Sequence, residues 1–244
     1  MDRFDGQMDS RGAVAMPALG RYELAQRTFF HRVFGWFGGG LLLTALVAWY
    51  FGTPDRFASI FGGRPATIWI LLIVQIGLVF AISRAVQKLS ATWAASLFVL
   101  YSALTGLTLS VLFLVYTSGS IASAFFASGG TFAVAAIYGA YTKKDLTKFG
   151  SLMQMAFMGF FIATIVNLFL RSSGLSWILS YVGVLIFIGL TAVDMQKLKA
   201  IHQNGIEGSG ADRALAVGGA LTLYLDFINL FILMLRIMGD RRQS

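Results

Sequence analysis

Seven long apolar runs divide the chain into segments that suit the thickness of a lipid bilayer. A transmembrane helix needs about 20 mainly apolar residues, and in hydrocarbon the backbone polar groups must be satisfied within the spanning structure itself. The sequence therefore predicts an all-α polytopic membrane protein, folded as a seven-transmembrane-helix bundle. The expected spans are 33–51, 67–86, 92–116, 120–141, 152–170, 177–193 and 214–238.

Composition supports a membrane setting and excludes several other classes of protein. The 244 residues are 57% hydrophobic and 12% charged, whereas soluble domains average about 25% charged residues. The chain has no cysteine and only two histidines, which excludes disulfides and thiolate metal sites and argues against a histidine-rich site. Its net charge of +8 comes from basic residues that flank the apolar runs, where they anchor helices to anionic lipid. We therefore expect the lipid bilayer as a partner, and no nucleic acid.

The chain divides into a tail and one domain. Residues 1–30 are polar and mixed in charge and lack the short apolar core of a signal peptide. We expect a flexible N-terminal tail over 1–30 and a single seven-helix transmembrane domain over 31–240. The three prolines, Pro17, Pro54 and Pro65, lie outside the spans, which favours largely continuous helices.

Small residues recur at helical spacing in two of the spans. Gly35 and Gly39 form one such pair, and Thr131, Ala135 and Gly139 form a second face. Small residues at this spacing let neighbouring helices approach closely. We interpret both faces as packing surfaces.

The distribution of lysine and arginine predicts the orientation. With the N-terminus in the cytoplasm, the inner side holds thirteen of the 19 basic residues and the outer side holds six. The C-terminal tail MGDRRQS is discordant, because seven spans place its two arginines outside. An alternative is a last run that enters the membrane and returns, but the run is long enough to cross. The inner set is Arg3, Arg11, Arg21, Arg27, Arg32, Arg84, Lys88, Lys143, Lys144, Lys148, Lys197, Lys199 and Arg213, and the outer set is Arg56, Arg64, Arg171, Arg236, Arg241 and Arg242.

Two aspartates are the leading functional candidates. Of the eleven acidic residues, only Asp194 and Asp226 lie within or at the end of a long apolar run. A charge at membrane depth costs roughly 2.5 to 3.5 kcal/mol on insertion scales, so such residues are functional hypotheses by default. The midpoint between them is Gly210, inside the polar link between the last two runs. In an antiparallel hairpin they could face each other, and two carboxylates sharing one site would hold a proton.

Arg84 and Asn229 are candidate neighbours of this pair. The second span runs inward and ends at Arg84, so all three charged groups could converge in the inner half of the bundle. Arginine keeps its charge and suits a carboxylate, so Arg84 is a candidate latch on one aspartate, leaving an excess acid to hold a proton or bind a cation. In the alternative interpretation, Arg84 snorkels to lipid phosphates and Asp194 faces water. Asn229, one turn after Asp226, is a possible second hydrogen-bonding neighbour.

These residues resemble the Bax inhibitor-1 (transmembrane Bax inhibitor motif) family in its bacterial form. The resemblance rests on LTAVDMQKLK at 190–199, on LTLYLDFINLFILMLRIMG at 221–239 and on seven apolar runs in matching order, from about Arg27 onward. The first motif departs from the family's usual Tyr-Asp-Thr-Gln, because Val193 and Met195 flank Asp194.

The resemblance implies a fold whose last helix is central and wrapped by the others. It also implies a pH-sensitive calcium leak with the aspartate pair as proton sensor, a latch arginine that maps onto Arg84, and residence in a bacterial inner membrane. Calcium takes six to eight oxygen ligands, so Asp194, Asp226, Asn229 and a few carbonyls would suit only a weak, transient site in a pore. We expect no resident cofactor and no enzymatic activity.

Two other functions remain open. A non-transporting membrane regulator, acting through protein partners that are unknown, fits the same sequence. An intramembrane aspartyl protease would also place one aspartate on each of two adjacent helices. The sequence motifs of such proteases are absent, because Asp226 lies in LYLDF rather than in Gly-x-Gly-Asp and no Pro-Ala-Leu motif follows it.

Overall fold

The computed structural model describes residues 18–62, 66–88, 90–203 and 210–242. Within these ranges seven helical spans carry the seven apolar runs, as predicted, and a short helix, α2 (Pro54–Phe61), lies in the first link. The chain is therefore an all-α polytopic membrane protein. The spans are α1 (Ala18–Phe51), α3 (Ala66–Gln87), α4 (Ala91–Leu109) with α5 (Val111–Val115), α6 (Ser118–Tyr141), α7 (Thr147–Leu170), α8 (Ser173–Gln203) and α9 (Gly210–Met238).

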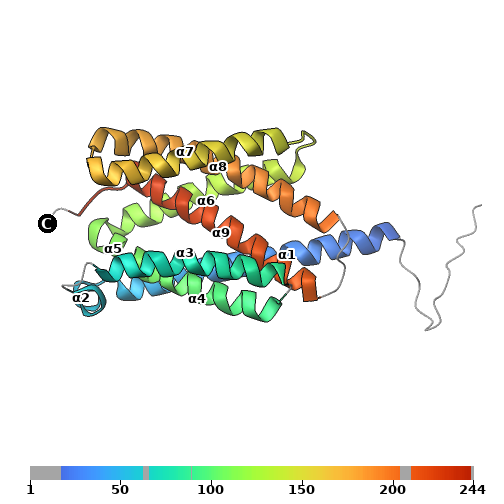
Figure 1. Ribbon diagram of the computed structural model, residues 1–244, viewed down its shortest axis with the longest axis horizontal. Helices are drawn as coiled ribbons and strands as arrows, with labels where there is room; N and C mark the ends of the chain where they lie inside the picture. The colour runs from blue at the N-terminus through green and yellow to red at the C-terminus, as the bar shows by residue number, and fades with distance from the viewer. Residues whose placement is uncertain (1–17, 63–65, 89, 204–209, 243–244) are drawn as a thin grey trace, which may run out of the picture.

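The last helix, α9, lies at the centre of the bundle. It crosses between a group formed by α1, α3 and α4 and a group formed by α6 and α8, and it contacts all five, while α7 packs on α8 (Figure 1). The side chains of Leu223 and Tyr224 are fully buried. The ring of Phe227 lies 5.8 Å from the ring of Phe37 on α1 and 5.6 Å from that of Phe132 on α6. The central position that the family resemblance implies is confirmed.

The bundle has two ends, which we call the N-side and the C-side. The N-side carries the start of α1, the end of α3, the α6–α7 link and the start of α9, and the C-side carries α2, the α5–α6 link and the end of α9 (Figure 1). On the C-side the backbone N–H of Thr117 donates to Asp240 at 3.2 Å, and that of Arg242 donates to Val115 at 2.9 Å. The chain after α9 is thus held opposite the start of α1, and the alternative of a last run that enters and returns is wrong.

Two element boundaries differ from the predicted ones. Helix α1 begins at Ala18, inside the stretch expected to be a flexible tail, and Phe29 is already 1% exposed; residues 1–17 of that tail lie outside the described part of the chain. The third span is broken at Ser110, although it contains no proline. The hydroxyl of Ser110 donates to the carbonyl of Leu107 at 2.6 Å, a local bond that competes with the regular helical pattern.

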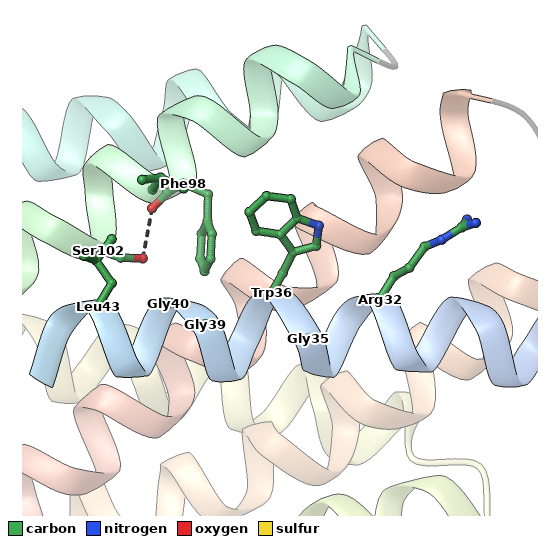
Figure 2. Close-up of a pocket in the computed structure, with 9 residues that line it drawn as sticks. Arg32, Gly35, Trp36, Gly39, Gly40, Leu43, Phe98 and Ser102 are labelled. Carbon is green, nitrogen blue, oxygen red and sulfur yellow. Dashed lines mark hydrogen bonds between the residues drawn. The ribbon is translucent and has the colours of Figure 1, made fainter. Parts of the chain in front are cut away.

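Close contacts between α1 and α4 lie at Gly40 and at Gly106 rather than at the predicted pair. A Cβ on Gly40 would lie 2.7 Å from the ring of Phe98 on α4. Gly35 and Gly39 have open space beside them, and they border a groove of about 460 Å³ between the two helices (Figure 2). The prediction that Gly35 and Gly39 form a close packing face is therefore wrong.

The second small-residue face does pack against a neighbour. A Cβ on Gly139 would overlap the backbone of Ala192 on α8, and Ala135 of the same face is buried. Only glycine permits this approach of α6 to α8. The contact holds the second half of α8 in place, where Asp194 lies.

Tryptophans mark the ends of the spans. Trp49, Trp69, Trp93 and Trp177 are all more than half exposed, and each lies within a few residues of the end of its helix. Tryptophan is enriched at both membrane–water interfaces because its amphipathic ring suits the headgroup level. The exposed surface between these rings is apolar, as expected for a lipid-facing bundle.

Candidate functional site

Asp226 is buried at the middle of the central helix. Its residue is 5% exposed, and its Oδ2 atom has no hydrogen-bond partner among the described residues. Leu223 and Leu230, which share its face of α9, are fully buried. A buried polar atom without a partner is costly, so its retention in an otherwise apolar helix points to a functional role.

Asp194 lies on the facing helix, α8, toward the N-side. Its side chain is 16% exposed, and its Oδ1 atom lies 2.8 Å from the Nζ atom of Lys197. The charges of Asp194 and Lys197 are the ones that act on the Asp226 carboxyl. The structure therefore places the two predicted aspartates on the neighbouring helices α8 and α9, one buried and one partly exposed. Their role as a proton sensor stays a prediction.

Arg84 lies apart from this pair. Its side chain is exposed and forms no ion pair with any residue of the described ranges. Helix α3 faces the bundle through Ile82, which is fully buried, and through Val86, which contacts Gly218 of α9. A residue two positions from either points about 200° around the helix, so Arg84 faces outward, into a groove beside Trp93. The predicted latch is not formed in this structure, whose geometry agrees with the snorkelling alternative.

Asn229 does not bind either aspartate in this structure. Its Nδ2 atom donates to the carbonyl of Leu225, one turn earlier in the same helix, at 2.7 Å. The side chain is half-buried. The amide therefore bonds within α9, and the predicted hydrogen bond to the pair is not formed among the described residues.

The two residues that depart from the family motif are packed in apolar contacts. Val193 is 1% exposed and lies against Gly150 of α7, and Met195 is 5% exposed. Next to them, Gln196 accepts from the backbone N–H of Leu146 at 2.9 Å and donates to the carbonyl of Lys144 at 2.8 Å. These bonds fix the N-side half of α8 to the α6–α7 link, so the direction of Asp194 is set by packing on both flanks.

A salt bridge between the first and last spans is the main feature that the sequence reasoning missed. Arg32 Nη1 lies 2.6 Å from Asp212 Oδ2, and the Asp212 residue is only 8% exposed. Figure 2 shows Arg32 among the residues that line the α1–α4 groove, with its guanidinium directed away from Trp36. Asp212 lies in the first turn of α9, where a carboxylate is favoured by the unsatisfied N–H groups. Asp212 was not selected from the sequence because it lies in the polar link before the last apolar run. Its partner Arg32 is 180 positions away, and local spacing does not reveal such a pair.

A second missed feature is a buried polar network among α1, α3, α4 and α9. The hydroxyls of Thr44 and Tyr224 lie 2.6 Å apart, and Thr44 also donates to the carbonyl of Ser102 at 2.8 Å. Gln75 on α3 donates to Thr108 at 2.7 Å. Polar side chains at every third position of the third span, at 102, 105 and 108, were the available signal. The network joins helices and lies on the face of α9 opposite Asp226.

The acidic residues do not form a closed metal cage. Within the described residues there is no group of three or more histidine, cysteine, aspartate or glutamate side chains that could hold a metal ion. The Asp194–Asp226 pair alone supplies too few oxygens for tight calcium binding. Any cation at this site would keep much of its hydration shell, as a passing ion does.

Comparison with known proteins agrees with this architecture. Residues 26–243 match the family model described as inhibitor of apoptosis-promoting Bax1. The chain is 45% identical to the inner membrane protein YbhL of Escherichia coli, over 99% of this chain and 100% of that protein. It is 42% identical to a protein of Borreliella burgdorferi over 91% of this chain and 95% of that one, and 38% identical to a membrane protein of Streptococcus pyogenes over 89% and 94%. The chain therefore belongs to the Bax inhibitor-1 family of multi-pass membrane proteins.

Proposed function

We propose that this protein is a pH-sensitive cation leak pathway, with calcium as the conducted ion and the Asp194–Asp226 pair as its proton sensor. The observation that carries the proposal is the Asp226 carboxyl, buried at mid-bundle with one oxygen unpartnered and under the influence of the Asp194 charge. A group in that position is stabilised by a proton or by a cation.

The chemistry of the pair gives the pathway its dependence on pH. When both carboxylates are charged, they repel each other and attract a divalent cation. When a proton enters the site, that attraction falls, because the pair loses one negative charge. Proton binding and cation binding therefore compete for the same oxygens. Lys197 Nζ lies 2.8 Å from Asp194 Oδ1, so its positive charge offsets part of the negative charge of the pair.

We further propose that the N-side faces the cytoplasm and that the protein resides in a bacterial inner membrane. The excess of lysine and arginine on the N-side supports the orientation. The relative YbhL is named as an inner membrane protein, which supports the membrane. Under this orientation, the partly exposed Asp194 is reached from the cytoplasm.

The test is calcium efflux from liposomes that contain the purified full-length protein. We expect a leak that changes with pH, and we expect Asp194→Asn and Asp226→Asn each to shift or abolish that change. Asp145→Asn is the matched control, since Asp145 is an exposed carboxylate in the α6–α7 link, and it should leave the pH profile unchanged. A flux equal to that of empty liposomes at every pH would contradict the proposal and favour a non-transporting regulator. Cleavage of a transmembrane peptide that both aspartate variants lose would favour the protease.

A further inference from the structure

A basic groove opens at the N-side between α1, α6 and α8. It has a volume of about 800 Å³. Its polar lining consists of Gln26, Arg27, His31 and Lys199 together with the hydroxyl of Tyr141, and the described residues that line it include no acidic side chain. The groove is therefore positively charged, and no side chain in its described lining neutralises that charge.

The basic groups of the groove keep donors free for a ligand. Lys199 donates to the carbonyl of Ala140 at 2.9 Å, which bridges α8 to the end of α6, and an ammonium has three donors in all. Arg27 and His31 are exposed on α1 and form no ion pair with any residue in the described ranges. A guanidinium and an ammonium around one opening suit the oxygens of a phosphate group.

The wall of the groove that continues into the bundle is apolar. Phe34 and Ile137 line it and are 39% and 59% exposed. Met195, the neighbour of Asp194, forms part of the floor. Large apolar side chains that remain exposed beside a charged opening are suited to a ligand that is polar at one end and apolar along its length.

We propose that this groove binds one anionic phospholipid of the N-side leaflet. The phosphate would contact Arg27, His31 and Lys199, and an acyl chain would lie against Phe34 and Ile137. The groove lies at the end of three spans, where headgroups are found, and basic pockets between transmembrane helices bind acidic headgroups. The absence of a carboxylate in the described lining favours an anionic headgroup over a zwitterionic one, because a zwitterionic headgroup also carries a cation that would need a partner.

The experiment is native mass spectrometry of the full-length protein in mixed micelles that contain equal amounts of phosphatidylglycerol and phosphatidylcholine. We expect one tightly held phosphatidylglycerol. Each basic contact near a membrane surface contributes roughly fivefold in affinity, so Arg27→Gln with Lys199→Gln should weaken this binding about thirtyfold. The control is Lys143→Gln with Lys148→Gln, which removes the same charge from exposed positions on the same side and should weaken it less than threefold.

A neutral variant separates the groove from general surface charge. Ile137→Trp fills the groove without changing the charge, and the exposed position tolerates a large side chain. We expect it to displace the bound lipid. The proposal is wrong if the two double variants weaken binding equally, if Ile137→Trp has no effect, or if phosphatidylcholine is retained as well as phosphatidylglycerol. Because the readout is bound lipid, the result is independent of whether the protein conducts calcium.

Discussion

The salt bridge between Arg32 and Asp212 predicts an asymmetry between the removal of its two halves. The two side chains are 40% and 11% exposed, respectively, and the paired atoms lie 2.6 Å apart. Arg32→Gln leaves a largely buried carboxylate without its cation, and an unpaired buried charge is strongly unfavourable. Asp212→Asn leaves a guanidinium that is already partly exposed and can turn toward water. We therefore expect Arg32→Gln to destabilise the fold more than Asp212→Asn.

The magnitudes follow from the burial of each partner. Breaking a fully buried pair costs about 3–5 kcal/mol, whereas exposed pairs contribute about 0–1 kcal/mol. This pair lies between these limits, and the first turn of α9 stabilises the Asp212 carboxylate by about 0.3–1 kcal/mol on its own. We expect a loss of about 2 kcal/mol for Arg32→Gln and about 1 kcal/mol for Asp212→Asn. The double variant contains no unpaired charge, so its loss should be about 1 kcal/mol rather than the sum.

Thermal unfolding of the purified protein in one detergent measures these differences. For a protein of this size, 1 kcal/mol shifts the Tm by about 2–4 °C, so we expect losses of about 4–8 °C for Arg32→Gln and about 2–4 °C for Asp212→Asn. Arg84→Gln is the matched control, because Arg84 is exposed and unpaired among the described residues, and it should shift the Tm by less than 1 °C. Equal losses for the two single variants, or additive losses in the double variant, would refute the reasoning.

Three further changes test the aspartate site and its surroundings. Asp226→Asn removes a buried carboxyl that lacks a hydrogen-bond partner at Oδ2. It should raise the Tm by a few degrees, and the leak should lose its response to pH. A lower Tm would contradict the destabilising effect assigned to the buried carboxyl. Arg84→Ala and Lys88→Ala should change the calcium leak equally little, because both side chains are exposed, and a selective effect of Arg84→Ala would restore the latch. Leu233→Ala should raise the calcium leak, because Leu233 is buried on the Asp226 face toward the C-side. Leu185→Ala, at a lipid-exposed position of α8, is its control and should leave the flux unchanged.

The features that the sequence predicted correctly are those that depend on one segment at a time. Apolar runs of about 20 residues predict spanning helices because the hydrocarbon thickness fixes their length. Asp194 and Asp226 could be selected as candidates because a carboxylate in such a run is rare and costly, and their role stays a prediction. Their placement on facing helices followed from the short link between the two runs, which makes them sequential neighbours in the bundle.

The features that the sequence missed depend on the rotation of helices about their axes. The sequence predicts that Arg84 reaches the aspartates because it lies at a suitable depth in the membrane. Depth alone, however, does not specify the direction in which a side chain points around the helix axis. The nearly uniform apolar surface of α3 gives no clear face, so the sequence does not show that Ile82 and Val86 point inward and that Arg84 points outward. The same limitation hid the Arg32–Asp212 pair, which forms only because α1 and α9 pack together.

The surroundings of Asp226 differ sharply toward the two ends of the bundle, and this asymmetry bears on how an ion would reach it. Toward the N-side lie the two charged groups that act on it, Asp194 and Lys197, both at least partly open to solvent. Toward the C-side its face of α9 continues with Leu230 and Leu233, both buried, and Leu233 packs against Gly183 of α8. Passage of an ion from Asp226 to the C-side would require α8 and α9 to separate along two turns of close apolar packing. Under the proposed function, this structure corresponds to a closed state, in which Asp226 is buried and an apolar barrier lies between it and the C-side.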